Sequence, residues 1–422
     1  MTDLLIAPSS ASSPLVGRPA PALGLVHGLV RRRALAQFAR LQSGAVLLRE
    51  GAGGTVFGNP AGALGTVPLD VHDGAFWGAL AARGALGAGE AYVAGHWSSA
   101  DPVALLRLFL RDREVLSAVD RTVWTLPARL LLRAHHWLRD NHRTGSRRNI
   151  QDHYDLGDEL FAQFLDPSLT YSAAWFAHPE QSLAEAQQHK LERLCRLVDL
   201  QPGDRLLEIG TGWGSLALVA AGRFGAQVTT TTISARQFAR AQQRFARAGL
   251  QERVTLLQRD YRDLDGTFDK LLSCEMIEAV GARWLPTYLQ VCAARLRPGG
   301  RFGLQAITIR DQQYDAALRS VDYIKRHVFP GSFIPSVQAI VTAASRHTDL
   351  RLVQLADFGE HYATTLAHWR SNLLAAPEPF LRAGGPNLLR AWDYYFAYCE
   401  AGFRERQLGV AQMLFERPGA AR

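Results

Sequence analysis

The chain has 422 residues, 47% of them apolar and 20% charged, and carries a formal net charge of +8 at pH 7. These totals are typical of a globular protein with two or more domains and exclude a disordered or fibrous chain. No run of about 18 apolar residues is present, which excludes a membrane-spanning helix. Residues 1–33 have no signal-peptide pattern and predict a flexible lead-in.

The small number of cysteines bears on the compartment and on metals. The four cysteines show neither a CxxC pair nor a metal-ligand spacing. This pattern favours a reducing compartment, with the cytoplasm as the default location, and argues against a metal site.

In chain order, residues 34–118 come first and predict a small α+β domain. Helical patterns are centred on 76–86 and 102–116. Short apolar runs separated by glycine precede them and predict strands at 46–48, 55–57 and 67–71.

A basic stretch follows, and residues 119–148 predict a helical linker. Between Arg107 and Asn149 there are ten arginines and four acidic residues, interleaved with leucines and with Trp124 and Trp137. This mixture suits an anionic membrane surface, where arginine meets phosphate groups and tryptophan lies at headgroup depth. No nucleic-acid-binding module is present. The alternative is an arginine-rich helical surface without a partner.

From residue 149 to 422, strands alternate with helices, and this region predicts a catalytic domain. Such alternation is typical of a doubly wound, mostly parallel α/β sheet of the Rossmann-like kind. The expected strands are 205–209, 227–232, 255–258, 270–273 and 301–307.

The first of these strands ends in Glu208, and Gly210, Gly212 and Gly214 follow it. The spacing ExGxGxG differs from the dinucleotide fingerprint, since position 215 is serine, and no lysine is present for a P-loop. Alternating glycines after a strand are typical of S-adenosylmethionine sites, because backbone without Cβ atoms packs closely against the ligand. The alternative is a glycine-rich turn with no ligand.

Two further segments support this cofactor, and one of them is Pro-Gly-Gly directly before the strand 301–307, as in many methyltransferases of this kind. Asp260 and Tyr261 follow the third strand, where an acid could accept a hydrogen bond from the adenine amino group and a ring could stack on it. The second strand ends without the usual acid. There, Ser234 and Gln237 also form an S-x-x-Q capping box, a local role that needs no cofactor.

Seven motifs occur in order and resemble the cyclopropane fatty-acid synthase and mycolic-acid methyltransferase family. The segment 87–97, "GAGEAYVAGHW", resembles the N-terminal domain of the longer bacterial synthases. The motifs are "NIQDHYDLGDELFAQFLDPSLTYSAAWF" (149–176), "LEIGTGWGSLA", "TTISARQ", "RDYRDL", "EMIEAVG" (275–281), "HVFPGSFIPS" (327–336) and "HYATTLAHW" (361–369).

The resemblance implies transfer of a methyl group from S-adenosylmethionine to a cis double bond of a phospholipid acyl chain. It implies a bicarbonate ion held by Glu278 and Tyr362, and it matches Cys399 to a family cysteine, which we expect to be a buried core thiol. The implied cofactor contacts are Tyr171, Ser172, Glu208, Gly210, Gly212, Gly214, Thr232, Gln237, Asp260 and Tyr261.

The chain departs from the family pattern around the bicarbonate position. Ala173 stands where many synthases have cysteine, and Gln305 where many have histidine. Thr211 replaces the usual cysteine of the glycine loop. The change at Thr211 is expected to have little effect, whereas Ala173 and Gln305 together predict an altered geometry of proton removal.

The chemistry requires a water-free site with aromatic faces, because methylation of an alkene leaves a carbocation on the acyl chain. The base is either the bound bicarbonate or Glu278 itself. Ring closure gives a cyclopropane, which the intact motifs rank first, and proton loss from a neighbouring carbon gives a methyl- or methylene-branched chain. The candidate aromatic residues are Tyr154, Tyr171, Trp175, Phe176 and Trp213.

Other functions stay open at this point. They are a lipid-binding protein with an inactive methyltransferase domain, a small-molecule methyltransferase and a nucleic-acid methyltransferase. The resemblance favours a cytoplasmic protein that associates peripherally with the membrane and is compatible with a homo-oligomer.

Overall fold

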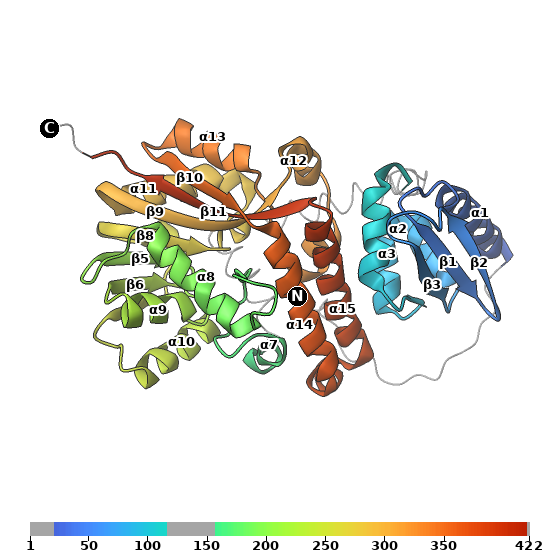
Figure 1. Cartoon of the computed structure of the whole chain (residues 1–422), viewed down its shortest axis with the longest axis horizontal. Coiled ribbons are helices and arrows are strands. Elements are labelled where there is room, and N and C mark those ends of the chain that lie inside the picture. The colour runs from blue at the N-terminus through green and yellow to red at the C-terminus, as the bar shows by residue number, and fades with distance from the viewer. Residues whose placement is uncertain (1–20, 116–156, 420–422) are drawn as a thin grey trace. The chain divides into compact units, whose positions relative to one another are not determined.

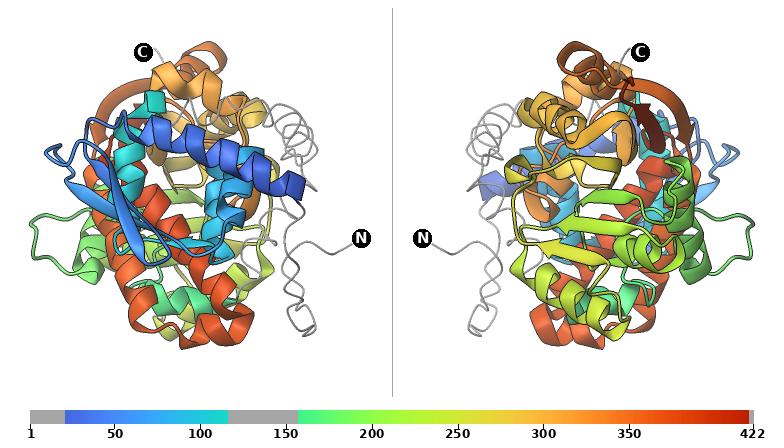
Figure 2. Two further views of the ribbon diagram at one scale, coloured as in Figure 1. Left: turned by 90° about the vertical axis from the view of Figure 1, so that its right-hand side faces the viewer. Right: turned by 90° about the vertical axis from the view of Figure 1, so that its left-hand side faces the viewer.

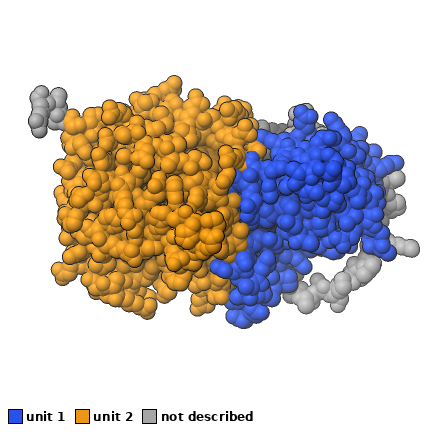
Figure 3. All heavy atoms as spheres, in the orientation of Figure 1, with its two compact units in different colours: residues 1–132, 370–405 blue, residues 133–369, 406–422 orange. Residues whose placement is uncertain are grey.

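The structure is a computed structural model that describes residues 21–115 and 157–419 (Figure 1). The chain divides into two compact units, coloured separately in Figure 3. Unit 1 comprises Met1–Leu132 and Arg370–Glu405, and unit 2 comprises Arg133–Trp369 and Arg406–Arg422. The predicted linker at 119–148 lies outside the described residues.

Unit 1 contains a four-stranded sheet in the order β2-β1-β3-β4. β1 pairs antiparallel with β2 and parallel with β3, and β4 pairs antiparallel with β3. The apolar runs expected to be strands are therefore β1, β2 and β3, and the α+β class is confirmed. The elements are α1 (Pro21–Phe38), β1 (Ala45–Glu50), β2 (Gly53–Gly58), β3 (Thr66–Val71), α2 (Ala75–Val93), β4 (Trp97–Ser98), α3 (Pro102–Arg111) and α15 (Glu378–Arg404).

Helix α1 begins at Pro21, inside the segment 1–33 for which we expected a flexible lead-in. The side chain of Val30 is only 6% exposed. Burial of apolar side chains stabilises a helix that sequence propensity alone would leave marginal. The expectation was therefore wrong for the part of the segment that lies in α1.

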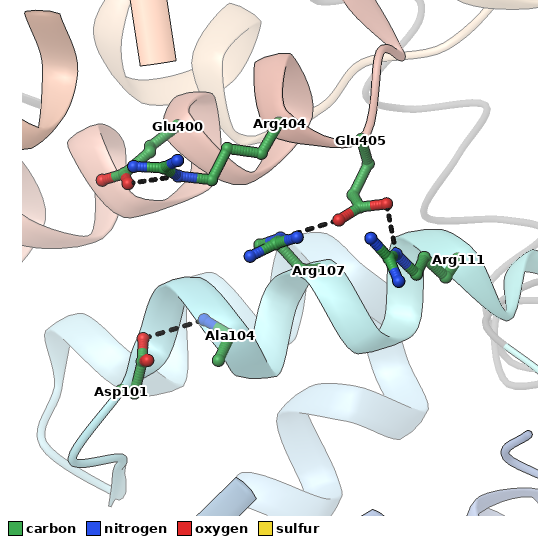
Figure 4. Close-up of polar contacts among 7 residues, drawn as sticks. All are labelled: Asp101, Ala104, Arg107, Arg111, Glu400, Arg404 and Glu405. Carbon is green, nitrogen blue, oxygen red and sulfur yellow. Dashed lines mark hydrogen bonds and ion pairs between the residues drawn. The ribbon is translucent and has the colours of Figure 1, made fainter. Parts of the chain in front are cut away.

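Helix α15 belongs to unit 1 because of contacts with α3 (Figure 4). The guanidinium groups of Arg107 and Arg111 each donate from Nε to the Glu405 carboxylate, at 2.7 and 2.6 Å. Val103 packs with Ala397 and Ala401 in a small apolar cluster. Residues 370–405 of the region 149–422 thus pack with unit 1, and the extent of the catalytic domain stays a prediction.

The two helices are also stabilised locally, as Figure 4 shows. Asp101 caps α3, since its Oδ1 accepts a hydrogen bond from the backbone N–H of Ala104 at 2.8 Å. Arg404 and Glu400 form an ion pair of 2.7 Å one turn apart on α15. Asp101 thus fixes the start of α3, at the end away from Glu405, and the ion pair lies in the last turns of α15.

Unit 2 contains a seven-stranded sheet in the order β10-β11-β9-β8-β5-β6-β7. Strands β9, β8, β5, β6 and β7 are parallel, whereas β11 runs antiparallel to both of its neighbours. The five predicted strands are confirmed as β5 to β9. The strands are β5 (Arg205–Ile209), β6 (Gln227–Thr231), β7 (Val254–Leu257), β8 (Phe268–Cys274), β9 (Leu296–Ile309), β10 (Arg351–Asp357) and β11 (Leu408–Glu416).

Helices cover both faces of this sheet (Figure 2). Along β5, Leu206 packs with Leu216 of α9 on one face, and Leu207 packs with Leu289 of α11 on the other. The doubly wound fold is thus confirmed. The helices and turns are α7 (Asp158–Phe164), α8 (Leu183–Leu197), α9 (Ser215–Arg223), α10 (Ala235–Arg247), η1 (Tyr261–Asp263), η2 (Ile277–Ala279), η3 (Ala282–Trp284), α11 (Leu285–Arg295), α12 (Asp311–Leu318), η4 (Ile324–Val328), α13 (Val337–His347) and α14 (Gly359–Ala375), whose last residues belong to unit 1.

The strand order determines where a ligand can bind. The chain continues from β5 outward to β6 and β7, and then returns to β8 on the other side of β5. Ligands of such sheets bind beyond the carboxyl ends of the strands at this switch point. The loops after β5 and β8 are therefore the ones to inspect.

Candidate active site

The glycine loop joins β5 to α9 at the switch point. Gly210, Gly212 and Gly214 all have positive φ angles, of 101°, 53° and 89°. A Cβ atom on Gly214 would lie 2.8 Å from the Phe245 ring, and one on Gly210 would lie 3.0 Å from Met276. A Cβ atom on Gly212 would meet nothing within 4 Å. The outer glycines therefore permit close packing, while the middle one faces open space that a ligand can use.

Glu208, at the end of β5, is buried beneath this loop. Its Oε2 accepts a hydrogen bond from the Thr230 hydroxyl at 2.5 Å, and Thr230 also bonds Thr211 at 2.6 Å. Burial raises the pKa of Glu208 to about 8, although the Thr230 hydrogen bond and the charge of Lys190 act in the opposite direction. Thr211, which replaces the family's usual cysteine, thus belongs to a buried polar chain.

The second strand brings Thr232 and Gln237 together. The Thr232 hydroxyl donates to Gln237 Oε1 at 2.8 Å. Ser234 caps α10, since its hydroxyl oxygen accepts from the Gln237 backbone N–H at 3.3 Å. Only this half of the expected capping box forms, because the Gln237 side chain bonds Thr232 instead. The contact between Thr232 and Gln237 is local, and a role of these two residues in binding the cofactor stays a prediction.

Asp260 and Tyr261 lie just after β7, as predicted, but both have protein partners. The carboxylate of Asp260 accepts from the Arg262 guanidinium at 2.8 and 2.7 Å. The ring of Tyr261 contacts Tyr288 edge-on at 5.5 Å. A hydrogen bond from adenine to Asp260 stays a prediction, and it would have to share the carboxylate with Arg262.

A half-buried carboxylate that sequence reasoning missed lies at the carboxyl end of β8. Glu275 accepts hydrogen bonds from the backbone N–H of Ala173 at 2.9 Å and from Gln305 Nε2 at 2.8 Å. The side chain of Tyr362 also hydrogen-bonds this carboxylate. Burial raises the pKa of Glu275, and these donors, together with the charge of Lys190, oppose the rise.

The backbone of Glu275 is strained. Its φ angle is +49°, a left-handed conformation that costs a non-glycine residue about 1–2 kcal/mol. Strain of this kind concentrates at functional sites, where the surrounding structure holds it. The signal available from sequence was position, since Glu275 opens the quoted motif "EMIEAVG".

Glu278, one turn later, is the second carboxylate of the pair. Its Oε1 accepts from the backbone N–H of Ile307 at 2.5 Å, and its buried Oε2 has no partner among the described residues. Burial raises the pKa of Glu278 to about 8, and the nearby charge of Glu275 adds to the rise. Two half-buried carboxylates that interact in this way favour sharing a proton.

Gln305 links this pocket to the antiparallel strand β11. Gln412 Nε2 donates to Gln305 Oε1 at 3.0 Å, so the Gln305 amide presents its N–H group to Glu275. The structure therefore brings together Glu278, Tyr362 and Gln305, as predicted, and adds Glu275 and Gln412. Gln412 had no sequence signal, because β11 was not predicted.

Aromatic rings form a wall beside the carboxylate pair. Tyr171 and Trp213 both contact Phe161, with ring centroids 5.2 and 5.1 Å apart. Trp369 lies 5.2 Å from Tyr171 and 5.9 Å, edge-on, from Tyr362. Tyr171 and Trp213 thus belong to one ring cluster with Phe161 and Trp369, and their contact with a substrate stays a prediction.

The other described aromatic candidates have different neighbours. The guanidinium carbon of Arg193 lies 3.9 Å above the Trp175 ring, whose other contacts are Phe358 and His361. Trp175 therefore already has a cation over one face, and its place at the substrate stays a prediction. Phe176 stacks with His361 and His368. Tyr154 lies outside the described residues.

Cys399 lies on α15 in unit 1. Its side chain is half-buried, whereas we expected a buried core thiol. Within 21–115 and 157–419, no helix is both long and apolar enough to cross a bilayer.

Comparison with known proteins gives a consistent picture. The family model described as mycolic acid cyclopropane synthetase matches residues 141–413. The tuberculostearic acid methyltransferase of Mycobacterium tuberculosis is 40% identical over 356 residues, which is 80% of each chain. The cyclopropane-fatty-acyl-phospholipid synthase of Escherichia coli is 34% identical over 367 residues, covering 84% of this chain and 89% of that one.

Solved structures agree. The mycolic acid cyclopropane synthase CmaA1, in a crystal structure with SAH and CTAB, superposes with a TM-score of 0.60 at 26% identity. The match covers 64% of this chain and 98% of that chain.

Proposed function

We propose that this protein methylates the cis double bond of a phospholipid acyl chain. The premise is that the chain belongs to the mycolic acid cyclopropane synthetase family and is an S-adenosylmethionine-dependent methyltransferase. The observation that carries the proposal is the carboxylate pair Glu275 and Glu278 beside an aromatic wall. Such a pocket suits a reaction that makes a cation and then removes a proton.

The residues of the glycine loop fit the cofactor. Gly212 faces open space, and the buried Gln237 side chain lies in the first turn of α10, which follows the next strand. With Tyr171 and Ser172 they would hold the methionine and ribose portions. When bound, S-adenosylmethionine supplies an electrophilic methyl group on a sulfonium centre.

The aromatic wall supports the cationic stage of the reaction. Phe161 and Trp369 are at most 1% exposed, so the wall keeps water from the acyl chain. Water would otherwise trap the carbocation. The faces of Tyr171 and Trp369 offer the π density that stabilises a cation at close range.

Proton removal then falls to the carboxylate pair. Glu275 takes the hydrogen bonds of Tyr362, Gln305 and the Ala173 N–H group. In the family that the sequence resembles, the residues at positions 362 and 173 contact a bicarbonate ion. In this protein Tyr362 and the Ala173 N–H group bind the Glu275 carboxylate instead. We infer that Glu275 is the base and that Glu278 shares the proton afterwards.

The position of Glu275 bears on the product. A base that is a side chain of the protein is fixed on one side of the cation. It therefore reaches the new methyl group less easily than a small bound ion would. We therefore place a methyl- or methylene-branched acyl chain first. Cyclopropane formation is the second candidate, favoured by the names of the matched family and of the E. coli relative.

We propose that the protein binds its lipid substrate at an anionic membrane surface, on the cytoplasmic side. The net charge of +8 supports attraction to anionic lipid.

Expression in a bacterium that lacks such activity, with methyl-labelled methionine, tests the proposal. Mass spectrometry should show mono-unsaturated chains that have gained one labelled carbon, and NMR before and after hydrogenation separates ring from branch. If the lipids stay unlabelled while the purified protein binds S-adenosylmethionine, the lipid substrate is wrong and a small-molecule methyltransferase takes its place.

A further inference from the structure

A buried lysine lies behind the pocket and has no part in the chemistry above. Lys190, on α8, is fully buried. Its ammonium group donates to Ser172 Oγ at 2.6 Å and to Cys274 Sγ at 3.6 Å. Among the described residues no carboxylate forms an ion pair with it. A buried charge without a direct counter-ion requires compensation from nearby groups.

That compensation comes from two carboxylates, of the buried Glu208 and the half-buried Glu275. The charge of Lys190 opposes the rise in pKa that burial causes at Glu208 and at Glu275. Cys274 directly precedes Glu275 in the chain, so the hydrogen-bonded neighbours of Lys190 also adjoin the proposed base.

The same helix holds the segment that faces Glu275. Gln187, one turn before Lys190, donates from Nε2 to the carbonyl groups of Thr170 at 3.3 Å and Ser172 at 2.8 Å. The next residue is Ala173, whose N–H group donates to Glu275. Gln187 and Lys190 thus fix both the backbone and the hydroxyl of Ser172.

We propose that Lys190 is a positioning residue for methyl transfer, which holds Ser172 so that the Ala173 N–H group points at Glu275 and which balances the charge of that carboxylate. The inference rests on the proposed function, because it concerns the same base.

Four titratable groups surround Glu275. They are Lys190 from α8, Cys274 from β8, Glu278 from η2 and Tyr362 from α14. Lys190 is the cation of this set. Without it the pKa of Glu275 rises further, so the ionised base is reached only at higher pH.

The test compares K190M with K270M, which makes the same change at a half-buried lysine of β8 outside the site. In the cofactor-free protein, hydrogen exchange of the Ala173 amide should become faster in K190M and stay unchanged in K270M. In a plot of the rate of methyl transfer against pH, the acidic limb should move to higher pH in K190M. On that limb the rate should fall about tenfold for each unit by which the pKa of Glu275 rises. K190R, which keeps the cation, should return the limb toward its wild-type position.

A folded K190M with unchanged exchange and an unchanged acidic limb overturns the proposal, since a purely structural lysine would lower the rate equally at every pH. If K190M does not fold, S172A decides: faster exchange at Ala173 supports the proposal and unchanged exchange contradicts it. If the wild type labels no lipid, the proposed function fails, and the exchange experiment still tests Lys190.

Discussion

The two ends of the site are built differently. The glycine loop is one short segment between β5 and α9, and its shape follows from three positive φ angles. The carboxylate pocket draws its donors to Glu275 from Ala173, Gln305 and Tyr362, on three separate segments. The loop therefore depends on local backbone geometry, whereas the pocket depends on the tertiary fold and on buried charge.

This difference suggests which changes each end tolerates. A change in the loop alters the space for the cofactor and the packing beneath it. A change in the pocket alters the ionisation of groups that are shielded from water, so its effect depends on pH.

The largest effect is expected for E275Q, which keeps the shape of the side chain and removes the proposed base. Loss of a general base lowers the rate by about 10²–10⁴-fold, while the affinity for S-adenosylmethionine, measured by calorimetry, should be unchanged. E360Q is the control, because Glu360 is an exposed residue of α14 that pairs with Arg406. Activity of E275Q near that of E360Q would remove Glu275 from the mechanism.

A smaller effect is expected for G214A, at the loop. A left-handed alanine costs about 1–2 kcal/mol, and the contact with Phe245 adds about 1–3 kcal/mol of overpacking. G249A is the control, since Gly249 has a φ of +66° and nothing within 4 Å of its added Cβ. Urea unfolding should show the larger loss of free energy in G214A, and equal losses would contradict the packing argument.

The third prediction concerns E278Q and the free energy of unfolding. The difference between E278Q and the wild type is expected to be smallest at low pH and to change as the pH rises. The pKa of Glu278 lies at about 8 in the folded protein, above the value of 4.5 for an ordinary glutamate. A raised pKa gives stability that is full below the unfolded value and is lost as the pH rises through the folded one. The free energy of unfolding of the wild type should therefore fall over this range. It should fall less in E278Q, and parallel curves would exclude Glu278 as the cause.

Local patterns predicted one end of the site well. The apolar runs of β5 to β9 and the glycine spacing could be predicted from the sequence, because each lies within one short segment. At the pocket, Glu278, Tyr362 and Gln305 were predicted from matched motifs, but their geometry was not. Gln412 lies on β11, whose pairing with β9 joins residues about a hundred positions apart, and no local signal encodes it.

Contacts between distant segments could not be predicted for a similar reason. Glu405, which directly follows α15, pairs with Arg107, 298 residues earlier in the chain, and with Arg111. Arg193 of α8 lies over the ring of Trp175. Each contact joins segments that only the folded chain brings together.

The central claim is that Glu275 serves in place of a bound bicarbonate. The most direct test measures methyl transfer in carbonate-free buffer and after addition of bicarbonate, for the wild type and for E275G, a change that also relieves the positive φ at this position. We predict that the wild type is indifferent to bicarbonate and that E275G is inactive until bicarbonate is added. A wild type that requires bicarbonate would contradict the claim.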